Sequence, residues 1–150
     1  MTNCVLPAMR MAVPSDEESY LTSARWFLAG TEALARCTAK ELTSCVFLAA
    51  QSLECALKAY LAHSGFTEKQ LKRPNLRHNL EALWTEAYKQ KLTISSTPPQ
   101  WCITLNAGHD RPYYMRYPMK GMNITNPVIE SMVEELRGLV DEVGTNLKKK

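Results

Sequence analysis

The stretch AAQSLECALKAYLAHSG, residues 49 to 65, decides how this chain folds. Its apolar residues continue a stripe that starts at Leu42 and recurs at steps of three and four, without a proline or glycine before Gly65. That period is typical of an amphipathic helix, and glycine suits the left-handed conformation that ends many helices. We therefore predict a long central helix from about Ala39 to Ser64.

Four other segments show the same helical period. Ser15 and Glu18 have the spacing of a capping box and open a predicted helix from about Asp16 to Arg36. The segment NLEALWTEAYKQKL predicts another helix, and a short one should end near Gly108. The final helix, about residues 127–147, has an apolar stripe opposite an acidic face. No segment alternates like a strand, so we predict an all-α fold, an antiparallel up-and-down bundle of four to five helices.

Length and composition indicate one cytoplasmic domain. The chain has 150 residues, of which 45% are hydrophobic, and a formal net charge of +3. Its apolar runs fall short of a membrane span. We divide it into a flexible N-terminal arm (1–14), a helical bundle (15–147) and a basic tail (148–150).

The cysteines and histidines give no pattern of a disulfide framework or a metal site. Five cysteines are scattered without a CxxC pair, which favours a reducing compartment and thiols that pack as small apolar groups. The three histidines, His63, His78 and His109, are far apart in sequence and lack the spacing that puts two ligands on one helix face. We predict no metal and no cofactor.

The segment HDRPYYMRYP, residues 109 to 118, concentrates hydrogen-bonding and stacking groups where Pro112 prevents a continuous helix. Arg116 lies between Tyr114 and Tyr117, so its guanidinium can fork onto a phosphate while it stacks on a ring. Alternatively, the tyrosines bury their rings and Arg116 pairs with an acidic residue of the last helix. A basic loop precedes the third long helix and contains Lys69, Lys72, Arg73 and Arg77.

Two further features leave alternatives open. Glu54 and Lys58 have the favourable i, i+4 orientation of an exposed ion pair, but they also fit a partly covered polar seam. His78 either caps the third helix, hydrogen-bonds a neighbouring helix end, or acts in catalysis. The tryptophans Trp26, Trp84 and Trp101 stand in apolar patterns, and we predict that they belong to the core.

Four pieces in order, AAQSLECALKAYLAHSG, RHNLEAL, LN and RYP, resemble the HEPN family, the "higher eukaryotes and prokaryotes nucleotide-binding" domain. The resemblance covers roughly residues 15–147. It implies a helical bundle that commonly forms a homodimer, found in nucleotidyltransferase partners, in toxin–antitoxin and defence systems, and in several ribonucleases. The ribonuclease branch carries an arginine followed after four to six residues by a helical histidine. Here that spacing runs from Arg73 to His78, in a loop that contains Pro74.

The resemblance and the segment HDRPYYMRYP together predict a non-catalytic module that binds a nucleotide or RNA phosphate, or a partner protein such as a nucleotidyltransferase. The alternative is a metal-independent endoribonuclease, with His109 or His78 as general acid or base and Arg116 or Arg111 stabilising charge on the phosphate. The residues expected to bind the ligand are Arg116, Arg111, Tyr117, Tyr113, Arg77, Arg73, Glu54 and Lys58.

Overall fold

The computed structural model describes residues 13–37, 42–117 and 127–149, which form six helices and no strand. The predicted all-α class is confirmed. Predictions that concern Ala39, Pro118, the arm up to residue 12 and the terminal Lys150 lie outside the described residues. The helices are α1 (Asp16–Ala35), α2 (Leu42–His63), α3 (Glu68–Leu71), α4 (Leu80–Lys89), α5 (Gln100–His109) and α6 (Ile129–Asn146).

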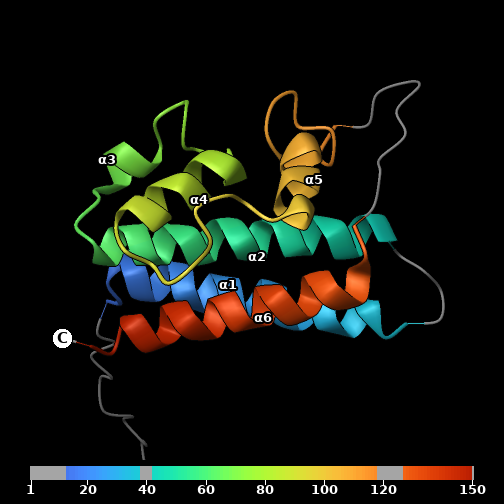
Figure 1. Ribbon diagram of the computed structural model, residues 1–150, viewed down its shortest axis with the longest axis horizontal. Coiled ribbons are helices and arrows are strands. Elements are labelled where there is room, and N and C mark those ends of the chain that lie inside the picture. The colour runs from blue at the N-terminus through green and yellow to red at the C-terminus, as the bar shows by residue number, and fades with distance from the viewer. Residues whose placement is uncertain (1–12, 38–41, 118–126, 150) are drawn as a thin grey trace, which may run out of the picture.

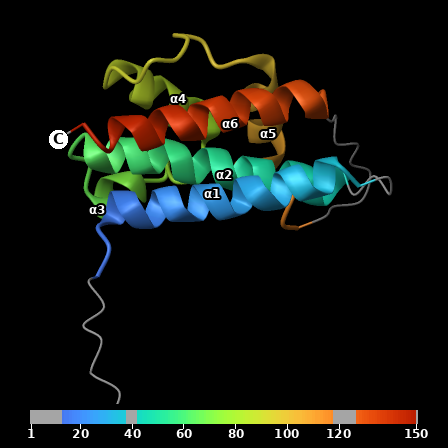
Figure 2. The ribbon, with the colours of Figure 1, turned by 90° about the horizontal axis from the view of Figure 1, so that it is seen from below.

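The helix α2 is the axis of the molecule, because it contacts α1, α4, α5 and α6. The long helices α1, α2 and α6 lie side by side, and α1 runs antiparallel to the other two (Figures 1 and 2). The shorter helices α4 and α5 contact each other and pack across α2 (Figure 1). Every other long element therefore depends on α2 for its packing surface.

Local signals explain where several helices begin and end. The capping box before α1 is formed, since Ser15 Oγ accepts from the Glu18 amide and the Glu18 carboxylate accepts from the Ser15 amide. Gly65 follows α2 with φ of 97°, as the sequence predicts. The one-turn helix α3 was not predicted, although its capping box is readable as Thr67 and Gln70.

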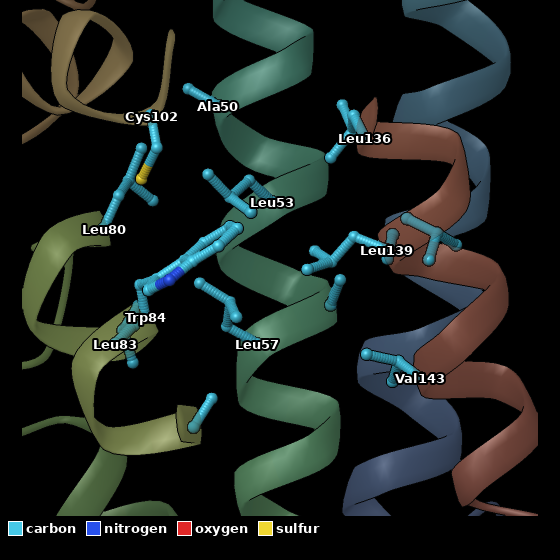
Figure 3. Packing of buried hydrophobic residues seen from close by; sticks show 14 of the residues in the cluster. Ala50, Leu53, Leu57, Leu80, Leu83, Trp84, Cys102, Leu136, Leu139 and Val143 are labelled. Atoms are coloured by element: carbon cyan, nitrogen blue, oxygen red, sulfur yellow. The ribbon is translucent and has the colours of Figure 1, made fainter. Parts of the chain in front are cut away.

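The core forms on two sides of α2 (Figure 3). Leu53 and Leu57 point from α2 into the space between the helices, and both are fully buried. Both lie on the side of α2 that faces α4 and α5, and side chains of α6 pack on its other side. The labelled partners are Leu80, Leu83, Trp84 and Cys102 on the first side and Leu136, Leu139 and Val143 on the second.

The prediction that all three tryptophans belong to the core is wrong for one of them. Trp84 and Trp101 are buried, but Trp26 is 73% exposed. The buried face of α1 consists of Leu21, Ala24, Leu28 and Thr31. At about 100° per residue, position 26 lies on the opposite face from 24 and 28, so the helical period itself turns this ring outward.

One helix is more apolar than the sequence reading allowed. An 18-residue window of α2 has a mean hydropathy of 1.3, and by length and composition alone the helix could cross a membrane. The expectation that no segment spans a membrane stays a prediction, because length and composition alone do not decide it. Of this window, 72% is buried inside the bundle, and the core helix of a soluble protein has the same composition. The finding is weak evidence for a membrane span.

The central position of α2 gives a stability prediction. Leu53→Ala should lower the free energy of unfolding by about 2–5 kcal/mol, because it removes a fully buried side chain and leaves a cavity between two groups of helices. Urea denaturation followed by circular dichroism measures this loss. The matched apolar truncation on the surface is Trp26→Ala, which should change stability by no more than about 0.5 kcal/mol. Equal losses for both variants would contradict the assignment of α2 as the core helix.

Candidate functional site

A charged pair lies inside the most apolar helix of the protein. Glu54 and Lys58 are one turn apart on α2, with side chains that are only 8% and 6% exposed. Lys58 Nζ donates to Glu54 Oε1 over 2.6 Å and to the carbonyl oxygen of Arg77 over 2.7 Å. The alternative of a solvated ion pair is therefore wrong, and the polar seam is the observed arrangement.

Two histidines converge on the second oxygen of the same carboxylate. His109, the last residue of α5, has Nε2 at 2.6 Å from Glu54 Oε2. His78, just before α4, has Nδ1 at 3.1 Å from that oxygen. The two rings meet edge to face with centroids 5.9 Å apart. Glu54 thus joins three segments, since it binds a lysine of its own helix and one histidine from each of two other segments.

The neighbours of Glu54 keep it ionised. Burial alone raises the pKa of a carboxyl group, but the His109 hydrogen bond and the charge and hydrogen bond of Lys58 outweigh it and lower the Glu54 pKa to about 2. As a carboxylate, Glu54 accepts from both histidines, which assigns protons to His109 Nε2 and His78 Nδ1. His109 Nδ1 is buried without a hydrogen-bond partner among the described residues.

The two histidines differ in their access to solvent. The His109 side chain is fully buried, whereas that of His78 is 15% exposed. The second nitrogen of His78, Nε2, has no hydrogen-bond partner among the described residues, yet it is not among the fully buried unpaired atoms. Burial lowers the pKa of His78, the hydrogen bond and charge of Glu54 oppose this, and Arg116 adds to the lowering. His78 is therefore the imidazole that a ligand can reach.

The segment 110–117, here called the strap, contacts His78 through Tyr113. The Tyr113 ring meets the His78 ring edge to face at 5.6 Å, and the Arg116 guanidinium lies 5.9 Å from the centre of the Tyr113 ring. Tyr113 has φ of 65°, an uncommon backbone conformation for a bulky side chain that costs energy and is concentrated at functional sites. The strap is held down where Met115 N donates to the carbonyl of Gly108.

A glycine permits this close approach of the strap to α5. A Cβ atom at Gly108 would lie 2.8 Å from Met115 Cε and 3.1 Å from Met115 Cγ. Two hydrogen bonds also fix α5 against α4. The Asn106 side chain accepts from the Leu80 amide and donates to the Glu81 carboxylate. The helix end that carries His109 is therefore positioned by contacts on both of its neighbours.

The structure brings together some of the predicted site residues and separates others. Glu54, Lys58, His78, His109, Tyr113 and Arg116 form one connected cluster, to which Arg77 contributes its carbonyl oxygen. The side chains of Arg73, Arg77, Arg111 and Tyr117 are exposed and have no ion pair or hydrogen bond among the described residues. His78 does not cap α4, since Asn79 does so.

Arg116 departs in detail from both of its predicted arrangements. It makes no ion pair with α6 within the described ranges, where the arginine of that helix, Arg137, pairs with Glu32 of α1 instead. It lies over Tyr113 rather than between Tyr114 and Tyr117. The role of Glu54 as the common acceptor for both histidines was missed, because no sequence spacing links residues 54, 78 and 109.

The cluster contains three side chains of types that can bind a metal ion. Separation in sequence is not a reason against one here, because Glu54, His78 and His109 place their ligand atoms within 4.8 Å of one another. The two contacts to Glu54 Oε2 have hydrogen-bond lengths, and the Lys58 ammonium already neutralises that carboxylate. The arrangement is that of a hydrogen-bonded network rather than an assembled set of metal ligands.

Comparisons with protein-family models, with curated proteins and with solved structures give no match for this chain. The function of this chain is therefore inferred from the geometry of its site.

Glu54 should control both stability and its acid dependence. Its folded pKa of about 2 lies below the ordinary value of 4.5, so its contribution is complete above pH 4.5 and is lost as pH falls towards 2. Glu54→Gln should lower the free energy of unfolding at pH 7 by about 3–5 kcal/mol, because it leaves the buried Lys58 ammonium without its carboxylate. The difference from wild type should shrink steadily between pH 5 and pH 2. Urea denaturation at a series of pH values measures both effects.

A matched control exists on the surface. Glu68 and Lys72 have the same i, i+4 spacing and the same 2.6 Å contact, but their side chains are 57% and 62% exposed. Glu68→Gln should therefore cost no more than about 1 kcal/mol at pH 7. A Glu54→Gln variant as stable as Glu68→Gln, or a loss that does not change with pH, would contradict the buried network.

Proposed function

We propose that this chain is a HEPN-type module that binds the phosphate of a nucleotide or RNA between the strap and His78. The observation that supports this most is the exposed Arg116 guanidinium, which stacks towards Tyr113 and has no acidic partner among the described residues. An arginine held on an aromatic ring keeps its forked donors free for a phosphate. The adjacent His78 offers one more accessible ring nitrogen.

The surroundings of the strap favour an anion. Arg73, Arg77 and Arg111 are exposed and unpaired in the part of the chain that the structure describes, and they flank His78 and Arg116 in sequence. Beneath them, Glu54 and Lys58 cancel each other's charge. The buried network therefore holds His78 in place without presenting a negative charge to a phosphate.

The HEPN resemblance extends this proposal to partners. It implies a cytoplasmic protein that forms a homodimer, associates with a nucleotidyltransferase-type protein, or acts in a toxin–antitoxin or defence system. Trp26 is consistent with a protein contact, because it is the most exposed large apolar side chain on any of the six described helices. Alanines at positions 29 and 33 lie on the same exposed face of α1, so a partner helix could approach the ring closely.

Binding of adenosine monophosphate and of a short single-stranded RNA, measured by calorimetry, tests the phosphate site. Arg116→Ala should weaken binding by about tenfold or more, which corresponds to the loss of one charge-assisted hydrogen-bonded contact. For RNA, the slope of log K against log salt should fall in magnitude by about 0.7, because one phosphate contact is lost.

The control is Arg36→Ala, an exposed arginine that forms an ion pair with Glu32 on α1. It should leave binding within about twofold of wild type, since Arg36 belongs to neither the strap nor the His78 cluster and its charge is paired with Glu32. Equal effects of the two variants would show diffuse attraction to a positively charged protein. Absence of any binding or thermal shift would overturn the phosphate proposal in favour of a protein partner.

One observation favours a second function, a metal-independent endoribonuclease. Glu54 orients His78 through Nδ1, which leaves Nε2 accessible as a general base beside a cation. The lowered pKa of His78 keeps its imidazole neutral at pH 7, as a base requires. In this candidate His78 takes the proton from the 2′-hydroxyl of the RNA as its oxygen attacks the adjacent phosphorus, and Arg116 stabilises the charge on the phosphate. The 5′-oxygen leaves and takes a proton from water, which gives a cyclic phosphate and a free 5′-hydroxyl. His109 is buried behind His78 and does not contact RNA.

Cleavage of single-stranded RNA in the presence of EDTA tests this second function. His78→Gln and Arg116→Ala should each lower the rate by about 100-fold or more, because a general base and a charge-stabilising donor contribute at least that much. Both variants must be purified like the wild type and shown to be folded by circular dichroism. Wild-type protein that leaves RNA intact, or variants as active as wild type, would exclude the enzyme.

A further inference from the structure

A cavity of about 290 Å³ lies between α6 and the segment that joins α4 to α5. Figure 2 shows that segment in yellow, running beside α6. The cavity shares no residue with the His78 cluster. Its walls are Trp84, Trp101, Pro99 and the loop residues 93–95, and its floor is the stripe Glu135, Gly138, Leu139 and Glu142 of α6.

The cavity presents negative charge on apolar walls. Glu135 and Glu142 are its two ionisable lining residues, and no basic residue lines it. Each carboxylate is held by a neutral donor: Trp101 Nε1 donates to Glu135 Oε2 over 2.6 Å, and Asn146 Nδ2 donates to Glu142 Oε1 over 2.9 Å. Neutral donors fix a carboxylate without cancelling its charge, so both carboxylates remain available to a cation.

The polar groups of the walls are already used within the protein. Trp84 Nε1 donates to the carbonyl of Ser95, and the Ser95 hydroxyl donates to the carbonyl of Thr97. The cavity therefore offers acceptors at its two acidic ends and apolar surface between them. The space beside Gly138 is open, since a Cβ atom there would have no neighbour within 4 Å.

The spacing along α6 limits the shape of the ligand. Glu135 and Glu142 are seven residues apart on one helix, which puts them on the same face at an axial separation of about 10 Å. Gly138 and Leu139 lie between them. A suitable ligand has two cationic groups separated by an aliphatic chain of that length, and the aromatic walls favour a cation that has lost part of its water.

We propose that this cavity binds a linear aliphatic polyamine, with one terminal ammonium group on Glu135 and the other on Glu142. The methylene segments lie over Leu139 and against the walls formed by Trp84 and Trp101, and the inner ammonium group of a triamine faces water at the exposed Gly138. The last helix also carries Glu130, Glu134 and Asp141, so the test must separate binding in the cavity from non-specific attraction to the acidic face of α6.

Isothermal calorimetry with spermidine, in the absence of nucleic acid and at 0.15 M salt to screen distant charges, tests the proposal. Spermidine should bind with one-to-one stoichiometry, and the shorter diamine putrescine should bind more weakly because it cannot reach both carboxylates. Glu135→Gln and Glu142→Gln should each weaken spermidine binding by about tenfold, the loss expected for one charge-assisted contact. Glutamine keeps an acceptor for the Trp101 and Asn146 donors, so the fold of the cavity is preserved.

The matched control is Glu134→Gln, an exposed α6 glutamate that does not line the cavity. It should leave binding within about twofold of wild type. Equal weakening by all three variants would overturn the site in favour of non-specific attraction to the acidic face of α6. Absence of spermidine binding by folded wild-type protein, or equal affinity for putrescine, would also overturn it.

Discussion

The carboxylate of Glu54 is the constraint on which the arrangement of the shorter helices depends. An unpaired carboxylate in this apolar interior would cost several kcal/mol, so the segments around α2 must supply donors. Lys58 supplies one from the same helix, and His78 and His109 supply two from the ends of neighbouring segments. Apolar packing alone can place α4 and α5 on α2. The hydrogen bonds to Glu54 also fix which ends lie together, because they bring the start of α4 and the end of α5 to the same carboxylate.

Burial divides the cluster into a supporting part and an accessible part. Glu54, Lys58 and His109 satisfy one another inside the protein, where none of them can contact a large ligand. His78 lies at the boundary, with one ring nitrogen committed to Glu54 and the other accessible. The strap continues this gradation outward, from the partly buried Tyr113 to the exposed Arg116. A rigid interior thus supports a surface on which an imidazole and a guanidinium share one aromatic ring.

The sequence predicted the long helices well and the site only in part. Periodic stripes, the Ser15 capping box and Gly65 are local signals, and local physics is enough to form the elements that they mark. The burial of Glu54 and Lys58 could not be read in this way, because an i, i+4 ion pair has the same spacing whether it is exposed or buried. The convergence of residues 54, 78 and 109 depends on how three segments pack. By contrast, the outward position of Trp26 was readable, since residue 26 is out of phase with the apolar stripe of α1.

Charge is separated across the molecule in a way that the small net charge conceals. The exposed, unpaired arginines Arg73, Arg77, Arg111 and Arg116 belong to the segments that precede α4 and follow α5 in the described part of the chain. The carboxylates of Glu135 and Glu142 line a different cavity on α6. At a physiological Debye length of about 8 Å, charges on separate surfaces are largely screened from each other. Each surface can therefore attract a ligand of the opposite charge, an anion at the arginines and a cation at the glutamates. The local charge, rather than the total of +3, sets the potential that a ligand meets.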